Sequence, residues 1–261
     1  MRRKRFGQHF LHDPAVIARI VEAVAPQPGD ALVEIGPGRG ALTRALLDAR
    51  FGSLDVIEID RDLAALLGTE LGWEPRLRVH ASDALRFDFA ALARERGRPV
   101  RIVGNLPYNI STPLLFHLLS SVGSIADMHV MLQREVVARM AAPPGQRAYG
   151  RLTVMLSPWV SVERLFDVGP GAFQPPPRVW SAVARLAVRS HPAFDPSPAF
   201  AAVVAAAFAH RRKTLGNALR GLATPAQIEA CGVDPSARPG TLAPAAYAAI
   251  AAALQLPAAR G

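Results

Sequence analysis

Three alternating glycines follow directly after a short apolar run near the start of the chain. Residues 31–35 are predicted to form a buried β-strand, residues 36–40 read Gly-Pro-Gly-Arg-Gly, and residues 41–49 are predicted to form an amphipathic helix. Glycines let the backbone approach a ligand closely, and the N-terminus of the following helix favours a negative group. An ordinary strand-to-helix turn seldom needs three such glycines, so the segment predicts a nucleotide-binding α/β unit.

A glycine or a polar residue lies at the end of each of four successive predicted strands. The strands are predicted over residues 31–35, 54–59, 77–80 and 100–103. The residues at or just beyond their ends are Gly36, Glu58, Asp83 and Asn105. In a doubly wound α/β sheet the ligand lies across the carboxyl ends of the parallel strands. These residues therefore predict an α/β fold with one ligand site at that edge of the sheet.

The spacing of the acidic residues predicts separate tasks for them. Glu58 follows Gly36 by about twenty residues, the spacing of an acid that binds ribose hydroxyls. Asp60 competes for this role but is also well placed to cap the next helix. Asp83 is suited to accept a hydrogen bond from an adenine amino group, with an N-cap of a following short helix as the alternative. The glycine loop also partly fits the NAD pattern, but a dehydrogenase needs an acid/base residue and a substrate domain.

The fourth predicted strand leads into the stretch 104–110, which reads Gly-Asn-Leu-Pro-Tyr-Asn-Ile. Asn105 offers one carbonyl acceptor and two N–H donors, and Pro107 keeps Leu106 extended, so nearby carbonyls stay free. Tyr108 adds an aromatic face. An exocyclic amino group of a nucleobase needs such acceptors and such a ring. The alternative is a tight turn with a core tyrosine. The stretch resembles the Asn-Pro-Pro-Tyr type motif of amino-group methyltransferases that use S-adenosylmethionine.

The charge of the chain points to a partner that carries phosphate. The formal net charge is +9 over 261 residues, and basic residues cluster at Arg2 to Arg5 and at His210 to Lys213. No apolar run is long enough to cross a membrane, and no apolar core of a signal peptide follows the basic start. The single cysteine, Cys231, excludes an internal disulfide and a cysteine-rich zinc site, and fits a cytoplasmic protein.

The last part of the chain changes character. Residues 190–198 contain three prolines and are predicted to be a linker, after which helices are predicted over residues 200–209, 214–222, 225–231 and 245–254. This predicts a small all-helical domain with a basic character. Arg211, Arg212 and Lys213 lie between two of its helices and are candidates for phosphate contact with RNA; the alternative is a solvated helix end.

Several motifs occur in an order that resembles one family. They are residues 5–11, 34–40, 56–60, 104–113, 173–179 and 211–215, and the match runs from about residue 3 to 254. Together they resemble the ribosomal RNA adenine dimethyltransferases, and within them the bacterial enzymes of the small subunit. The resemblance implies a Rossmann-like S-adenosylmethionine-dependent methyltransferase domain, residues 1–190, followed by a helical RNA-binding domain, residues 191–261.

The resemblance also implies a reaction and site residues. Two adjacent adenosines, in a hairpin loop near the 3′ end of 16S rRNA in the small ribosomal subunit, become N6,N6-dimethylated during ribosome biogenesis. The matching motifs assign cofactor contacts to His9, Leu11, Gly36, Glu58, Asp83 and Asn105. Many members have Asn at the position of His9, a change that a backbone contact would survive. We expect a monomer, and no metal.

The expected chemistry places the target base between the motif and an aromatic ring. Tyr108 stacks on the adenine, Phe173 flanks its other face, and the Asn105 oxygen with the Leu106 or Pro107 carbonyl accepts the N6 hydrogens. Two alternatives stay open: the related 23S rRNA enzyme of macrolide resistance, and a non-catalytic ribosome assembly factor on the same fold. The intact motif at residues 105–108 favours catalysis.

Overall fold

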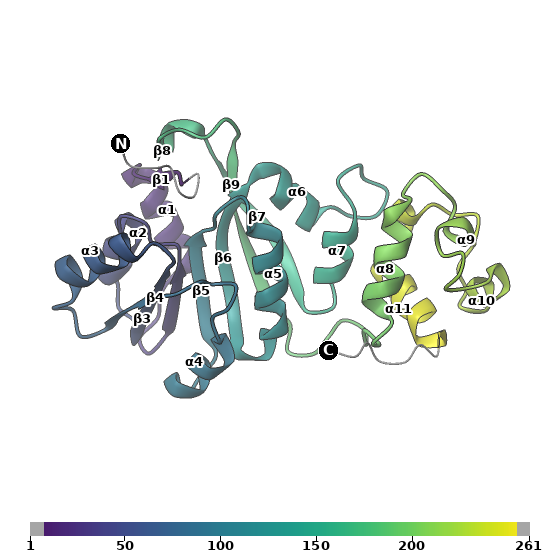
Figure 1. Ribbon diagram of the computed structural model, residues 1–261, viewed down its shortest axis with the longest axis horizontal. Helices are drawn as coiled ribbons and strands as arrows, with labels where there is room; N and C mark the ends of the chain where they lie inside the picture. Colours follow the sequence, from purple (N-terminus) through teal and green to yellow (C-terminus); the bar gives the residue numbers. More distant parts are fainter. Residues whose placement is uncertain (1–7, 255–261) are drawn as a thin grey trace. The chain divides into compact units, whose positions relative to one another are not determined.

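The computed structural model describes residues 8–254, and Figure 1 labels their helices and strands. The basic residues Arg2 to Arg5 lie outside this range. Within it, the chain forms two compact units. The first runs to Val137 and resumes over Val162–Val188, and the second comprises Ala138–Ser161 and the chain from Arg189 onward. The second unit thus takes in residues 138–161, which the sequence pattern groups with the first domain; the boundary at residue 190 stays a prediction.

A seven-stranded sheet organises the first unit, in the order β4-β3-β2-β5-β6-β9-β7. Strands β2 to β6 pair in parallel, and β9 is antiparallel to β6. The doubly wound α/β fold is therefore confirmed. The strands are β2 (Ala31–Ile35), β3 (Ser53–Glu58), β4 (Leu77–Ala81), β5 (Val100–Asn105), β6 (Ile125–Gln133), β7 (Val160–Val168) and β9 (Ser181–Val188).

A glycine stands where the two central strands, β2 and β5, meet at their carboxyl ends. All five residues of β2 are buried, as a parallel strand covered on both faces requires. Gly104 in β5 faces the end of β2, where an added Cβ would stand 2.3 Å from the carbonyl oxygen of Ile35. Only glycine fits there, and its small size brings Asn105 next to the glycine loop.

Helices cover both faces of this sheet, and α5 crosses the face turned toward the viewer in Figure 1. Asp60 caps α3 through its carboxylate, as predicted, and Asp13 caps α1 in the same way. The short helix expected from residue 84 begins only at Phe89, where Asp88 supplies the cap. The helices are α1 (Pro14–Val24), α2 (Ala41–Leu47), α3 (Arg61–Leu71), α4 (Phe89–Arg96), α5 (Ser111–Ser120) and α6 (Arg134–Ala141), with the 3-10 turns η1 (Val122–Ser124) and η2 (Pro170–Ala172).

A second, two-stranded sheet joins the N-terminal segment to a distant part of the first unit. Strand β1 (Phe10–Leu11) pairs antiparallel with β8 (Phe173–Gln174). Residues 6–11 show no period that predicts a strand, and the pairing partner lies far along the chain. Phe173 is 1% exposed and belongs to a buried core cluster that also contains residues of α1 and α2. The expectation that Phe173 flanks a target base is therefore wrong.

The second unit is mainly helical and has its own core. Tyr149 and Tyr247 are fully buried in it, and the Tyr149 hydroxyl donates to the carbonyl of Leu242 at 2.7 Å. The helix predicted over residues 214–222 is shorter than expected, because the chain turns after residue 218 and Gly221 has φ of +93°. The helices of the second unit are α7 (Arg151–Leu156), α8 (Phe200–Ala209), α9 (Leu215–Ala218), α10 (Pro225–Ala230) and α11 (Pro244–Ala253), with the 3-10 turn η3 (Pro239–Thr241).

No helix in residues 8–254 is long and apolar enough to cross a membrane.

Candidate active site

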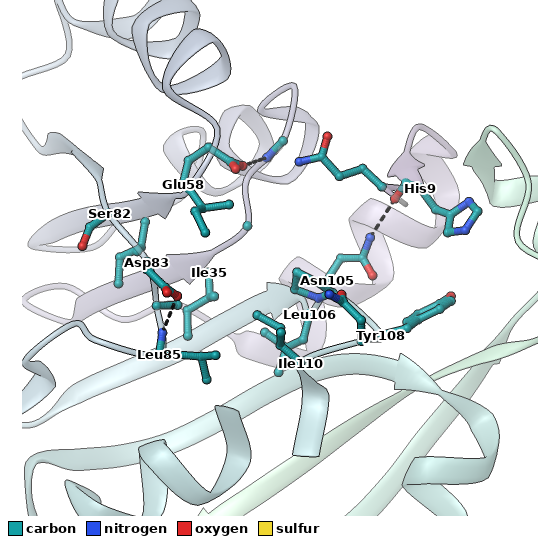
Figure 2. A pocket seen from close by; sticks show the side chains of 18 of the residues that line it. His9, Ile35, Glu58, Ser82, Asp83, Leu85, Asn105, Leu106, Tyr108 and Ile110 are labelled. Atoms are coloured by element: carbon teal, nitrogen blue, oxygen red, sulfur yellow. Dashed lines mark hydrogen bonds between the residues drawn. The ribbon is translucent and has the colours of Figure 1, made fainter. Parts of the chain in front are cut away.

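A cavity of about 270 Å³ opens at the carboxyl ends of the central strands in the first unit (Figure 2). The chain leaves β2 for β3 on one side and returns to β5 on the other, so the cavity lies at the topological switch point, where doubly wound sheets bind ligands. Most of the predicted site residues line it: His9, Gly36, Glu58, Asp83, Asn105, Leu106, Pro107 and Tyr108. One part of the sheet thus gathers residues from five separate segments.

The glycine loop forms one wall and touches the N-terminal segment. Gly38 has φ of +56°, and an added Cβ would stand 2.8 Å from the Phe10 ring. Gly36 has φ of +70°, with the carbonyl oxygen of Asn105 at 3.5 Å from the position of its absent Cβ. Side chains at either position would strain the backbone and fill the space beside it. The loop is therefore shaped as a cradle.

Glu58 ends β3 and is fixed by main-chain donors. Its Oε2 accepts from the Gly38 N–H at 3.1 Å and its Oε1 from the Asp60 N–H at 3.0 Å. The residue is 3% exposed, and burial raises the pKa of the carboxyl, which these backbone hydrogen bonds lower in part. Asp60, the competitor from sequence, uses its own carboxylate to cap α3. Glu58 is therefore the acid that the fold holds rigidly at the cavity wall.

Asp83 follows β4 and lies across the cavity from Asn105 (Figure 2). Its Oδ1 accepts from the Leu85 N–H at 2.9 Å, which orders the turn after the strand. The N-cap alternative does not apply, because Asp88 caps α4. The second carboxylate oxygen has no hydrogen bond among the described residues, so Asp83 can both shape the turn and accept from a ligand.

Asn105 is the last residue of β5, which runs two residues farther than the strand predicted over residues 100–103. Its Nδ2 donates to the carbonyl oxygen of His9 at 3.1 Å, which leaves the side-chain oxygen as an acceptor. The next residue, Leu106, is fully buried and its N–H donates to the Met131 carbonyl at 3.1 Å. The start of the motif is thus anchored on both sides.

Tyr108 is held through its hydroxyl by a residue that the sequence pattern did not indicate. Its Oη lies 2.5 Å from Oγ of Ser181, the fully buried first residue of β9. Burial raises the pKa of the tyrosine, and the Ser181 hydrogen bond partly offsets this. The His9 ring lies 5.9 Å from the Tyr108 ring at a tilt of 33°, and its Nδ1 is 2.7 Å from the carbonyl of Pro175.

Apolar side chains complete the walls, and sequence reasoning did not name them. They lie at or just beyond the strand ends that carry the polar residues, which is the signal that would have found them. They are Ile35, Ile57, Ile59, Leu85 and Ile110. A flat apolar ring fits between such walls, while the acidic groups suit hydroxyl and amino donors.

The remaining predicted residues lie elsewhere. Leu11 is 8% exposed and borders a smaller adjoining hollow of about 40 Å³ with Glu34 and the glycine loop. Arg211, Arg212 and Lys213 belong to the second unit and are exposed on its surface. The guanidinium of Arg211 donates to the carbonyl of Gln146 at 3.2 Å, so one member of the basic cluster also holds a loop.

The first unit combines a doubly wound sheet, a glycine cradle, an acid at the end of the next strand and an Asn-Leu-Pro-Tyr motif at the end of β5. These features define a Rossmann-like S-adenosylmethionine-dependent methyltransferase. The chain belongs to the ribosomal RNA adenine dimethylase family, whose model matches residues 1–256. The class and the family together make it an S-adenosylmethionine-dependent rRNA adenine dimethyltransferase, as the sequence motifs predict.

Relatives of high identity carry one name. The chain is 55% identical to "Ribosomal RNA small subunit methyltransferase A" of Nitrosococcus oceani over 251 residues, which cover 95% of this chain and 94% of the relative. It is 54% identical to the protein of the same name from Pseudomonas aeruginosa over 252 residues, with 95% and 93% covered.

Solved structures share the architecture. The crystal structure of the 23S rRNA methyltransferase ErmE matches with a TM-score of 0.73 and 28% identity, over 95% of this chain and all of that one. A dimethyladenosine transferase from Plasmodium falciparum matches with a TM-score of 0.80 at 24% identity, over 93% and 96%.

Proposed function

We propose that this enzyme dimethylates N6 of two adjacent adenosines in the loop of a hairpin near the 3′ end of 16S rRNA, within the small ribosomal subunit or its precursor. The observation that carries the proposal is the Asn105 amide, whose nitrogen is bound to His9 and whose oxygen remains as an acceptor at the cavity. The name shared by relatives at 52–55% identity supports the small subunit as the target.

The cavity residues fit S-adenosylmethionine, which when bound supplies an electrophilic methyl group. Glu58 is positioned to accept from ribose hydroxyls, because two backbone N–H groups orient its carboxylate. Asp83 has an oxygen available for the adenine amino group, and the walls of Ile57 and Leu85 suit the ring. Gly36 lets the loop backbone come close, and the carbonyl of His9 and the side chain of Leu11 border the end of the site nearest Asn105.

The target adenine must leave its stack, which costs a few kcal/mol and least in a loop. Tyr108 compensates by stacking on the base, an interaction worth about 1–3 kcal/mol. The Asn105 oxygen and the carbonyl of Leu106 accept the two N6 hydrogens. The Pro107 carbonyl, the other candidate from the sequence, already accepts from the Ile110 N–H at 3.2 Å and from the Ser111 hydroxyl at 3.0 Å. Accepting both hydrogens draws the N6 lone pair out of conjugation, so the nitrogen becomes a better nucleophile.

Catalysis in this scheme is positioning and electrostatics. The Asn105 side chain is fixed by His9 and the Tyr108 ring by Ser181, so neither must be ordered when the base arrives. N6 becomes cationic on methylation and loses its proton readily. The scheme therefore needs neither a metal ion nor a base of unusual pKa.

The second unit is proposed to hold the rest of the ribosomal RNA. Arg211, Arg212 and Lys213 are exposed, and no acidic residue occurs from Pro196 to Ile228. Phosphate contacts of such residues position a protein without reading bases. We propose that the enzyme acts as a monomer in the cytoplasm, where ribosomal subunits are assembled.

A methyl-transfer assay tests the function directly. The enzyme, labelled S-adenosylmethionine and small subunits that lack the modification are incubated, and the modified nucleotides are mapped by mass spectrometry. Bare 16S rRNA and 23S rRNA serve as comparison substrates. We expect dimethyladenosine at two adjacent positions of 16S rRNA. Label in 23S rRNA instead would favour the macrolide-resistance type of enzyme, and binding to subunits without any label would favour an assembly factor.

A further inference from the structure

Trp180 is a large aromatic residue that the fold holds rigidly yet leaves half exposed, at 49%. Its carbonyl accepts from the Arg134 N–H at 2.9 Å, which extends the pairing of β9 with β6 by one residue. Its ring packs beside Gly169, where an added Cβ would stand 3.7 Å from the indole. A tryptophan with a fixed backbone and one supported edge keeps a ring face presented to solvent.

The surroundings of this indole are cationic. The Arg134 guanidinium carbon lies 5.7 Å from the ring centroid, within the range of a cation–π contact, and the side chain is 52% exposed. Asp167 stands 3.8 Å from Arg134 but also binds Arg164, so two arginines share one carboxylate. Arg178, two residues before Trp180, is exposed as well. The Arg134 guanidinium over the ring places a positive charge beside the indole, which suits phosphate.

Trp180 is the chain neighbour of a residue that supports the candidate active site. Ser181, the residue after Trp180, holds the Tyr108 hydroxyl at 2.5 Å. Ser181 pairs with Gln133 at the end of β6, so Trp180 lies at the same edge of the sheet as the cavity. Consecutive residues of an extended chain point to opposite sides, and their Cα atoms are about 3.8 Å apart. The Trp180 side chain therefore leaves the chain on the side opposite to that of Ser181, with its Cα one residue from the partner of Tyr108.

We propose that Trp180 is a second stacking site, for an RNA base that neighbours the extruded adenosine. The inference rests on the proposed function. Extruding one base removes a stacking partner from the next base in the strand, and an exposed indole beside a guanidinium can replace that partner. The positive surroundings favour a nucleotide over an apolar protein segment as the occupant.

Co-sedimentation of unmethylated small subunits with Trp180→Ala tests this, because binding is measured without turnover. Trp73→Ala is the matched control: Trp73 is 75% exposed and precedes β4, at the opposite edge of the sheet. We expect Trp180→Ala to weaken subunit binding about 5- to 150-fold, the range for loss of one base–aromatic stack. Its cofactor affinity and its melting temperature should match those of Trp73→Ala. Equal subunit binding by the two variants would overturn the proposal.

Two further variants distinguish an RNA base from an apolar protein surface as the group that binds Trp180. Trp180→Phe keeps an aromatic face and should retain most of the affinity, whereas Trp180→Leu keeps apolar volume and should bind about as weakly as Trp180→Ala. If Trp180→Leu retained as much subunit affinity as Trp180→Phe, Trp180 would dock on a ribosomal protein, and the proposed stacking site would be wrong. If the wild type binds subunits but transfers no methyl group, the proposed reaction fails, while the comparison of Trp180 variants still stands on binding alone.

Discussion

The side-chain nitrogen of Asn105 donates to the main-chain carbonyl of His9 across 3.1 Å, so the N-terminal segment orients the residue that ends β5 (Figure 2). Because the acceptor is backbone, the contact does not depend on the identity of side chain 9. It also selects one orientation of the amide, with the oxygen left for a donor such as N6. Pairing of β1 with β8 holds this segment in place.

Replacing Asn105 by Ala should therefore reduce methyl transfer strongly at saturating cofactor and RNA. The change removes an acceptor at the reacting nitrogen, and loss of one such group lowers kcat by about 10²- to 10³-fold. Single-turnover assays on small subunits measure it. His9→Asn is the control, because it keeps the carbonyl, and its kcat should stay within about threefold of wild type. A severe loss in His9→Asn would show that the ring itself is needed.

Tyr108 and Ser181 should behave as a coupled pair. Tyr108→Ala should be severe because it removes the stacking face, whereas Tyr108→Phe and Ser181→Ala each remove one hydrogen bond, worth about 1 kcal/mol. Since both single changes delete the same contact, the double variant Tyr108→Phe/Ser181→Ala should be little worse than either one. If Tyr108→Phe were as damaging as Tyr108→Ala in kcat, the hydroxyl would be essential and the stacking role wrong.

Features with a local signal in the sequence were predictable. Buried parallel strands, the glycine turn and the aspartate caps each depend on residues within a few positions, so β2, the loop and the caps of α1 and α3 follow from the sequence. Contacts between distant segments were not predictable from the sequence. The pairing of residues 10–11 with 173–174 and the bond from Tyr108 to Ser181 join segments more than seventy residues apart, and no local period marks them.

Phe173 shows the limit in the other direction. The prolines that follow Phe173 predict a stiff, extended segment, and from this stiffness we expected the ring to be exposed. The sequence does not tell which side of the segment faces the core. Phe173 pairs with Leu11 of β1 and is buried in the core cluster that also contains residues of α1 and α2, whereas Trp180 is a half-exposed aromatic residue of this region.

Glu58→Ala should weaken S-adenosylmethionine binding while binding of RNA stays near normal. A charge-assisted hydrogen bond contributes about 1.5–3 kcal/mol, so we expect roughly a 10- to 150-fold rise in Kd. Titration calorimetry measures the affinity. Glu70→Ala, an exposed carboxylate on α3, serves as the control and should bind the cofactor as wild type does. Unchanged affinity in Glu58→Ala would count against its assignment to the ribose.

Glu34 should make stability depend on pH. It is 2% exposed, and burial raises the pKa of its carboxyl from the ordinary 4.5 to about 7; the Thr43 hydroxyl, which donates at 2.6 Å, lowers the pKa and nearby Glu58 raises it further. The folded state therefore binds more protons than the unfolded state between pH 4.5 and 7. The resulting stability is present below pH 4.5 and is lost as pH rises through about 7.

Glu34→Gln removes this dependence because the amide stays neutral. A pKa raised from 4.5 to about 7 corresponds to roughly 3 kcal/mol. We expect the difference in free energy of unfolding between Glu34→Gln and wild type to shift in favour of the variant from pH 5 to pH 8, by up to that amount. Urea unfolding at the two pH values measures this shift. Glu70→Gln should show no such relative change. A Glu34→Gln difference that is constant across this range would mean that the buried carboxyl does not titrate there.

Arg212→Ala/Lys213→Ala should weaken binding to small subunits and flatten its dependence on salt. Each phosphate contact adds close to one unit to the slope of log K against log salt, so the double variant should lose about two units. Arg211 is left in place, because it also bonds the loop carbonyl of Gln146, and its removal mixes docking with loop stability. Binding titrations at several salt concentrations give the slopes, and cofactor affinity should not change.

Arg78→Ala is the control for charge alone, since Arg78 is exposed but paired with Glu95 at 2.5 Å in the first unit. Adding Arg211→Ala to the double variant should remove up to one further unit of slope and also lower the melting temperature. An unchanged slope in the triple variant would mean that the basic cluster is only a solvated surface. RNA docking would then rest on Arg2 to Arg5 and on the rim of the cofactor cavity.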